Sequence, residues 1–193
     1  MMRTLCLCLM LTGAVVAGGL LFKETDVPGT RLIHQDSLGP FWPQVENLPE
    51  PLRTPESAPQ SAELLAKVVL SGFKLEGHRW VFSGQAGQVT VDSGTYPSAV
   101  RALDGLLYLV YEGAAPKFHP SYYPFQVAAS ERPVLTAVSL GDRGYRVAWP
   151  VSKVTLVYFV VGPHIFMVDS SSVDLEVGAA RAAVARASEL LGR

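Results

Sequence analysis

The fold of this chain is decided by the segment Val154–Asp169, which reads VTLVYFVVGPHIFMVD. Two runs of β-branched and aromatic residues flank Gly162-Pro163-His164, a sequence that is typical of a turn. The pattern therefore predicts a β-hairpin with strands at Val154–Val161 and Ile165–Asp169.

Two further hairpins are predicted upstream of this one. They pair His78–Ser83 with Gln88–Asp92 across Gly84–Gly87, and Val134–Leu140 with Tyr145–Trp149 across Gly141–Gly144. Each pair consists of short runs rich in strand-forming residues, separated by glycine-containing turns. Such connections favour antiparallel pairing of neighbouring strands.

Three helices are predicted from apolar residues at three- and four-residue spacing. They cover residues 58–71, a segment that starts at Pro97, and Val173–Leu191. In the middle helix Gly105 leaves an alternative open, in which the helix ends there and residues 106–111 form a buried strand. Serine and aspartate side chains before the last helix are expected to cap its N-terminus.

The predicted order of elements is α-β-β-α-β-β-β-β-α. Runs of hairpins with few helical crossovers indicate an α+β fold with a mostly antiparallel sheet of hairpins and helices packed on one face. We expect this to be a single domain over residues 58–193, preceded by an N-terminal membrane helix.

The first 23 residues, MMRTLCLCLMLTGAVVAGGLLFK, predict that membrane helix. From Thr4 to Phe22 the segment carries no charge, and a helix of this length measures about 28 Å, close to the roughly 30 Å hydrocarbon thickness of a bilayer. Arg3 precedes the apolar run, which favours a cytoplasmic N-terminus and an extracytoplasmic C-terminal domain. The bilayer is thus one expected contact of the chain.

A cleaved signal peptide is the alternative for this segment, because Val15-Val16-Ala17 is an acceptable cleavage site before Gly18. The protein would then be secreted or periplasmic. The apolar run continues past that site to Phe22, and this favours an uncleaved signal anchor.

Residues 24–57 are predicted as a proline-rich connector that sets the reach of the domain from the bilayer. Half of the chain's 14 prolines lie between Glu24 and Gln60, and proline disfavours helix at the residue before it. Phe41 and Trp42 depart from the composition of a plain spacer. They either pack back onto the domain or form a docking motif for another protein.

Composition excludes some partners and chemistries. The chain has 16 Lys and Arg against 17 Asp and Glu, a formal net charge of −1, which argues against nucleic acid as a partner. Both cysteines, Cys6 and Cys8, lie in the N-terminal segment, so the exported part has neither a disulfide nor a thiol nucleophile.

No stretch carries a catalytic, cofactor or metal motif. A Gly-x-Ser-x-Gly elbow and a phosphate-binding loop are both missing, and the four histidines form no ligand pair. His164 and Asp169 come nearest, but five residues along one strand place them on opposite faces. We expect Asp169 and Asp174, on either side of three serines, to lie in a polar loop before the last helix. No metal and no cofactor are predicted.

The candidate binding surface is an aromatic segment between prolines, Lys117–Phe125. Its candidate contact residues are Phe118, His119, Tyr122, Tyr123 and Phe125, together with Phe41 and Trp42. Tyrosine offers a large contact area at a low entropic cost, which suits recognition. The alternative is a loop whose rings cover the core.

These features favour a membrane-anchored, non-catalytic binding or assembly module outside the cytoplasm, with an envelope or membrane protein as its partner. A carrier of a small apolar ligand is the second hypothesis. A small exported hydrolase with a dispersed site around His119 or His164 is the third.

Overall fold

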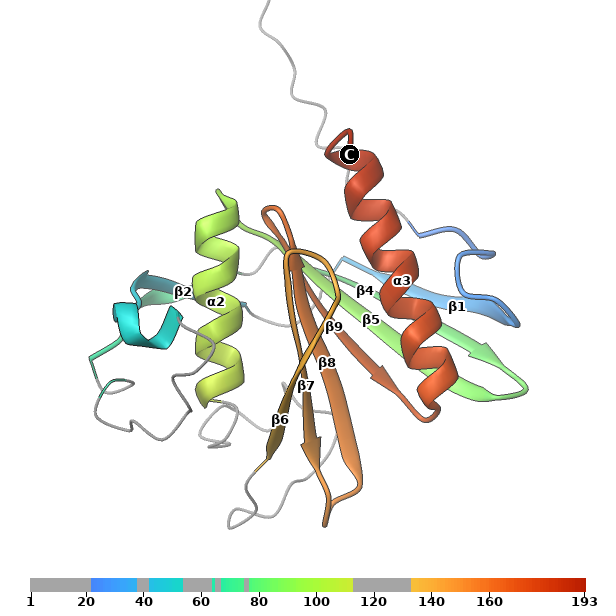
Figure 1. The fold of residues 1–193 in the computed structure, drawn as a ribbon. Coiled ribbons are helices and arrows are strands. Elements are labelled where there is room, and N and C mark those ends of the chain that lie inside the picture. The colour runs from blue at the N-terminus through green and yellow to red at the C-terminus, as the bar shows by residue number, and fades with distance from the viewer. Residues whose placement is uncertain (1–21, 38–41, 54–63, 65–66, 75–76, 113–132) are drawn as a thin grey trace, which may run out of the picture.

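The computed structural model describes residues 22–37, 42–53, 64, 67–74, 77–112 and 133–193. The elements are β1 (Thr30–Asp36), β2 (Trp42–Asn47), η1 (Glu50–Arg53), β3 (Val69–Lys74), β4 (Gly77–Gly84), β5 (Gly87–Thr95), α2 (Ala99–Glu112), β6 (Val134–Val138), β7 (Arg143–Trp149), β8 (Val154–Val161), β9 (His164–Ser170) and α3 (Val173–Leu190). The fold is α+β, as the sequence predicts (Figure 1).

The main sheet has seven strands in the order β1-β4-β5-β9-β8-β7-β6, and every neighbouring pair is antiparallel. The three predicted hairpins are confirmed as β4–β5, β6–β7 and β8–β9. Pairing of β5 with β9 joins the first hairpin to the later four-strand meander. This junction is important for the site because it places residues about 80 positions apart in sequence side by side.

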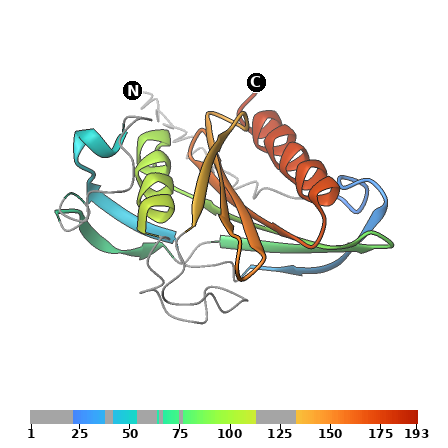
Figure 2. The same ribbon diagram turned by 60° about the horizontal axis from the view of Figure 1, so that its bottom comes forward.

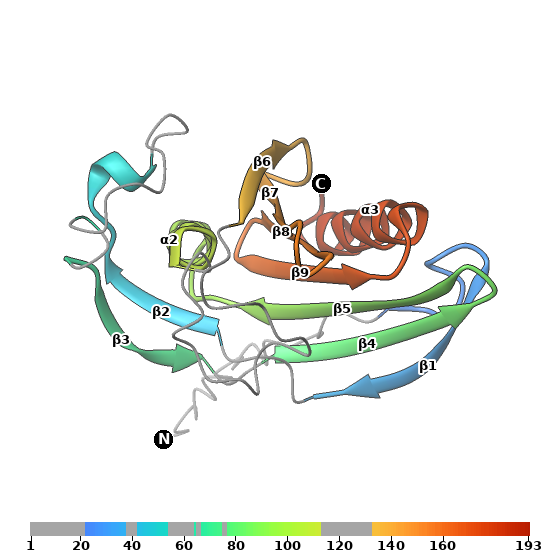
Figure 3. The same ribbon diagram turned by 90° about the horizontal axis from the view of Figure 1, so that it is seen from below.

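The first predicted helix, over residues 58–71, is helical as predicted at Leu64 and is corrected at its C-terminal end. Residues 69–71 begin strand β3, which pairs with β2 in a separate two-stranded sheet beside α2 (Figure 3). The pairing is irregular on both sides of Val45. The spacing of valine and leucine in this segment is compatible with a short strand packed against the core as well as with a helix. Most of residues 58–68 lies outside the described residues.

Two strands and η1 lie within residues 24–57, the segment predicted as a connector. β1 pairs with β4 at the edge of the main sheet, and β2 pairs with β3. Pro43 is the one proline within these two strands, and it is compatible with β2 because this strand lies at an edge, where a missing N–H costs no ladder hydrogen bond.

The two helices cover opposite faces of the main sheet, which corrects the prediction that they share one face (Figure 2). In β8, Leu156 and Tyr158 pack in the cluster that contains α2, whereas Val157 and Phe159 pack in the cluster that contains α3. An unbroken apolar strand is typical of a strand that is buried on both faces.

α2 is continuous through Gly105, so the alternative in which residues 106–111 form a strand is wrong. A Cβ at this position would lie 2.5 Å from the hydroxyl oxygen of Tyr96 and 3.2 Å from the carbonyl oxygen of Pro43. The Tyr96 hydroxyl donates a 2.6 Å hydrogen bond to that carbonyl. Glycine therefore lets the helix approach β2 closely.

The chain enters the domain through Phe22, whose side chain is 5% exposed and packs with Trp80 and Phe82 in the α3-side cluster. Asp26 accepts two hydrogen bonds from Arg186 of α3, which fixes this segment to the helix. Among the described residues, no helix combines the length and apolarity needed to cross a bilayer. The predicted membrane helix lies almost wholly in residues 1–21, outside the described residues.

Candidate functional site

A pocket of about 440 Å³ lies on the face of the main sheet that carries α2, beyond the part of that face over which α2 packs. We call it the open-face pocket. It is lined by Arg79, Val81, Gln88, Thr90, Asp92, Met167, Asp169, Ser170 and Ser171. Met167 belongs also to the α2-side core, which places the pocket on that face.

Strand register arranges the polar side chains of the pocket in rows. Arg79 lies opposite Asp92 across β4 and β5, and Asp92 lies opposite Met167 across β5 and β9. In the next row, Thr90 lies opposite Asp169. Cross-strand partners point to the same face of a sheet, so these side chains form one continuous surface.

Arg79 and Asp92 form a bidentate ion pair in this surface. Nε of Arg79 donates to one carboxylate oxygen at 2.7 Å and Nη2 donates to the other at 2.9 Å. Asp92 is fully buried, and this burial raises the pKa of its carboxyl against the opposing effect of Arg79. The hydrogen bonds that Arg79 donates to Asp92 raise the pKa of the Arg79 guanidinium, so the arginine stays charged.

Asp169 lies in the same pocket without such a partner. No described residue donates a hydrogen bond to its carboxylate or forms an ion pair with it. Burial raises the pKa of Asp169, the charge of Asp92 raises it further, and Arg79 opposes both effects. Arg79 is thus shared between carboxylates, and the negative charge of Asp169 is only partly balanced.

The serines at the end of β9 hold the rim of the pocket. The hydroxyls of Ser170 and Ser171 each donate to the carbonyl oxygen of Gln88, both at 3.3 Å, and the Gln88 N–H donates to the Ser171 hydroxyl at 3.1 Å. Ser172 is the N-cap of α3 but makes no side-chain cap hydrogen bond. The expected serine capping is therefore not observed at Ser172, and Ser170 and Ser171 connect β9 to β5 instead.

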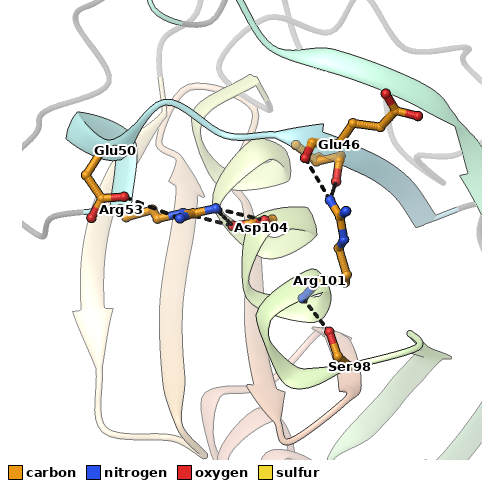
Figure 4. Close-up of polar contacts among 7 residues, drawn as sticks. Glu46, Glu50, Arg53, Ser98, Arg101 and Asp104 are labelled. Carbon is orange, nitrogen blue, oxygen red and sulfur yellow. Dashed lines mark hydrogen bonds and ion pairs between the residues drawn. The ribbon is translucent and has the colours of Figure 1, made fainter.

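A second polar region joins β2 and η1 to α2 (Figure 4). Nη1 of Arg101 donates to the carbonyl oxygens of Val45 and Glu46 at 2.5 Å and 2.8 Å. Arg53 donates two hydrogen bonds of 3.1 Å to the buried Asp104. The cations thus bind groups of the protein itself, and we assign this region to holding the β2–β3 sheet on the helix.

Of the predicted binding residues, the structure describes Trp42 alone. Its side chain is 1% exposed and lies in the α2-side core, where it contacts the backbone at Gly94. This position matches the packing alternative, and a buried indole offers no surface to a partner. The other predicted residues, Phe41, Phe118, His119, Tyr122, Tyr123 and Phe125, lie outside the described residues.

His164 lies at the start of β9, with Nδ1 3.1 Å from the hydroxyl oxygen of Thr95. Burial lowers the pKa of this imidazole, so it is neutral near pH 7. No carboxylate contacts the ring among the residues that the structure describes, so the ring lacks the orienting third group of a catalytic triad.

Within the described part of the chain, no three His, Cys, Asp or Glu side chains are grouped to hold a metal ion. Comparison with known proteins gives no family either: no family model, no curated protein and no solved structure matches this chain. The open-face pocket is therefore interpreted from its own chemistry.

Sequence reasoning missed Arg79 and Asp92, and it placed Asp169 where the last strand meets a polar loop without assigning it a binding site. One signal was present, because a hairpin turning at Gly84–Gly87 pairs Arg79 with Asp92 directly. The pairing of Thr90 with Asp169 had no local signal, since it depends on the contact between two distant strands.

Proposed function

We propose that this chain is a membrane-anchored, non-catalytic binding module outside the cytoplasm, and that it recognises an envelope or membrane protein through the open-face pocket. The observation that carries this proposal is Asp169, a partly buried carboxylate in a sizeable pocket with no partner from the described residues. Buried charges are costly unless they are paired, so an unpaired one in a pocket favours a ligand that pairs with it.

The pocket supports binding better than acid–base chemistry. A pair of catalytic carboxylates needs one group free to act as nucleophile or base. Asp92 has both oxygens engaged by Arg79, and it is fully buried. Asp169 alone lacks a second group for proton transfer among the described residues that line the pocket.

Phe22 changes the expected role of the connector. It is the last residue of the apolar run, and its ring lies in the domain core. If residues 4–21 span the bilayer, the domain lies directly on the membrane surface, and the proline-rich segment does not act as a spacer.

The exported hydrolase remains a second candidate because of one contact, that of the Thr95 hydroxyl with Nδ1 of His164. A neutral imidazole beside a hydroxyl is the arrangement of a general base and its nucleophile. Replacement of His164 by alanine tests this candidate, because a hydrolase centred there would lose its activity.

Site-specific photo-crosslinking in native membranes tests the binding module. A benzoylphenylalanine at the exposed Gln88, on the rim of the pocket, is compared with one at the exposed Arg181 of α3, on the opposite face. We expect one discrete envelope protein to cross-link from position 88 alone, and Asp169→Asn to abolish that product. Equal cross-linking from both positions, or none, would contradict the proposal.

A further inference from the structure

The open-face pocket has an excess of negative charge around a single guanidinium. Arg79 lies opposite Asp92 in β5, and Asp169 lies one row away on β9. Both carboxylates act electrostatically on Arg79. Since one cation cannot neutralise two anions, this part of the pocket favours a further positive charge.

Only one of the two carboxylates in the pocket is open to a ligand. Both oxygens of Asp92 are occupied by Nε and Nη2 of Arg79, at 2.7 Å and 2.9 Å. The described residues give the oxygens of Asp169 no donor. A ligand that binds here would therefore place its positive group against Asp169.

The neighbours of Asp169 suit a compact cation with several N–H donors. Thr90 faces Asp169 across the two strands, and Gln88 lies two residues from Thr90 on the same face. The Asp169 carboxylate, the Thr90 hydroxyl and the Gln88 side-chain amide offer acceptor oxygens from two strands. An ammonium group has three rotatable donors, which matches acceptors spread in this way.

Apolar side chains complete the pocket beside these acceptors. Val81 and Met167 line it together with the polar groups. An alkyl chain that carries an ammonium group can pack its methylene groups against such side chains while its charged end reaches a carboxylate. A free inorganic cation requires oxygen ligands around it rather than apolar side chains, so this mixed lining suits an alkylammonium group better.

We propose that the open-face pocket binds an alkylammonium group, with Asp169 as its counter-ion. This inference rests on the proposed binding function and adds the chemistry that is recognised. Two sources present the same group: a lysine side chain of the protein partner, and a free aliphatic amine.

Met167 provides a direct probe of binding. The chain has four methionines, and the other three, Met1, Met2 and Met10, all precede the described residues. Carbon-13 labelling of the methionine methyl groups therefore places one NMR signal in the pocket. The measurement uses the full-length protein in micelles of a non-ionic detergent.

N-acetyl-lysine N-methylamide is the test compound, and N-acetyl-norleucine N-methylamide is its uncharged match. We expect the lysine compound to shift the Met167 signal saturably and the norleucine compound to leave it in place. Asp169→Asn should weaken binding at least about tenfold, and Thr90→Val should weaken it less. Asp174→Asn, an equal change of charge at an exposed residue of α3, should have no effect.

The ligand-free position of the Met167 signal reports whether each variant is folded, so a loss of binding is separated from a loss of structure. A Met167 signal that the lysine compound does not move, or that moves equally with norleucine, would overturn the inference. Full binding by the Asp169→Asn variant would overturn it as well.

Further comparisons separate the two sources and the two proposals. Loss of cross-linking in Asp169→Asn identifies a lysine of the partner. Binding of 1,4-diaminobutane together with undiminished cross-linking by Asp169→Asn identifies a free amine, and it contradicts recognition of the partner through Asp169 while the ammonium inference stands. If position 88 cross-links a partner but the lysine compound does not bind, the ammonium inference is wrong while the binding module stands. If both experiments fail, both proposals are wrong.

Discussion

The ring of Phe22 lies 4.8 Å, centroid to centroid, from the indole of Trp80, and the two planes are tilted by 50°. Phe82 completes the contact with its ring 5.9 Å from Phe22 in an edge-to-face arrangement. Aromatic pairs at these distances stabilise a core beyond the area that they bury. The last residue of the apolar N-terminal run is therefore an integral part of the domain.

Phe22→Ala should lower the free energy of unfolding by about 3 kcal/mol or more, since it removes a buried ring and leaves a cavity. Chemical denaturation of the full-length protein measures the change. Ile33→Ala is the control, because its side chain is 60% exposed, and we expect it to cost less than about 0.5 kcal/mol. Equal losses in the two variants would show that Phe22 is not packed as described.

The proposed membrane anchor would end at Phe22, so the proposal predicts a short distance between domain and bilayer. Cys6 and Cys8, the chain's two cysteines, are replaced by serine, and a fluorophore is then placed on a single cysteine at position 23 or 151. Val151 is 79% exposed and follows β7, at the opposite end of that strand from Asp142, which contacts Arg193. Nitroxide lipid headgroups should quench the label at position 23 strongly and the one at 151 weakly. Weak quenching at both positions would indicate a spacer between the domain and the membrane.

The hairpins were predictable because their information is local. Glycine turns at 84–87, 141–144 and 162–164 stop one strand and begin the next, and the register follows from the turn. The final helix was predictable for a similar reason, since its apolar and charged residues keep helical spacing over 18 residues.

The strands before residue 75 were not predictable in this way. β1 finds its partner β4 more than 40 residues later, and only tertiary contacts compensate for its polar side chains and the irregularity near His34. The pocket has the same origin, because β5 and β9 bring Thr90 to Asp169 across a pairing that no local pattern marks. The unbroken apolar run of β8 indicates a strand that is buried on both faces, with one helix on each side of the sheet. The hairpin pattern alone does not carry this information.

Asp26 should make stability depend on acid pH. Hydrogen bonds from Arg186 lower the pKa of its carboxyl, so the ionised form is favoured by folding. A group with a lowered pKa contributes stability above its ordinary pKa of about 3.9 and loses that contribution as the pH falls through the folded-state value. Asp26→Asn should therefore be less stable than the original protein at pH 7, and the difference should shrink below about pH 4.

Thermal unfolding followed by circular dichroism over this pH range measures the difference. The Asp26→Asn/Arg186→Gln double variant serves as the control. Asp26→Asn already breaks the ion pair, so adding Arg186→Gln should cost less stability than breaking a second, independent pair would. A difference between the original protein and Asp26→Asn that stays constant with pH would show that the ion pair does not form.

Gly94 and Gly178 should respond to alanine with opposite signs. A Cβ at Gly94 would overlap the indole of the buried Trp42, which has no room to move, so Gly94→Ala should cost about 1–3 kcal/mol by overpacking. A Cβ at Gly178 in α3 would meet nothing closer than 4.0 Å, at Val27 and Pro28. Gly178→Ala should therefore stabilise the protein by about 0.5–1 kcal/mol, through the higher helix propensity of alanine. Denaturant midpoints of the two variants test the signs, and a neutral Gly94→Ala would show that Trp42 is not seated against β5.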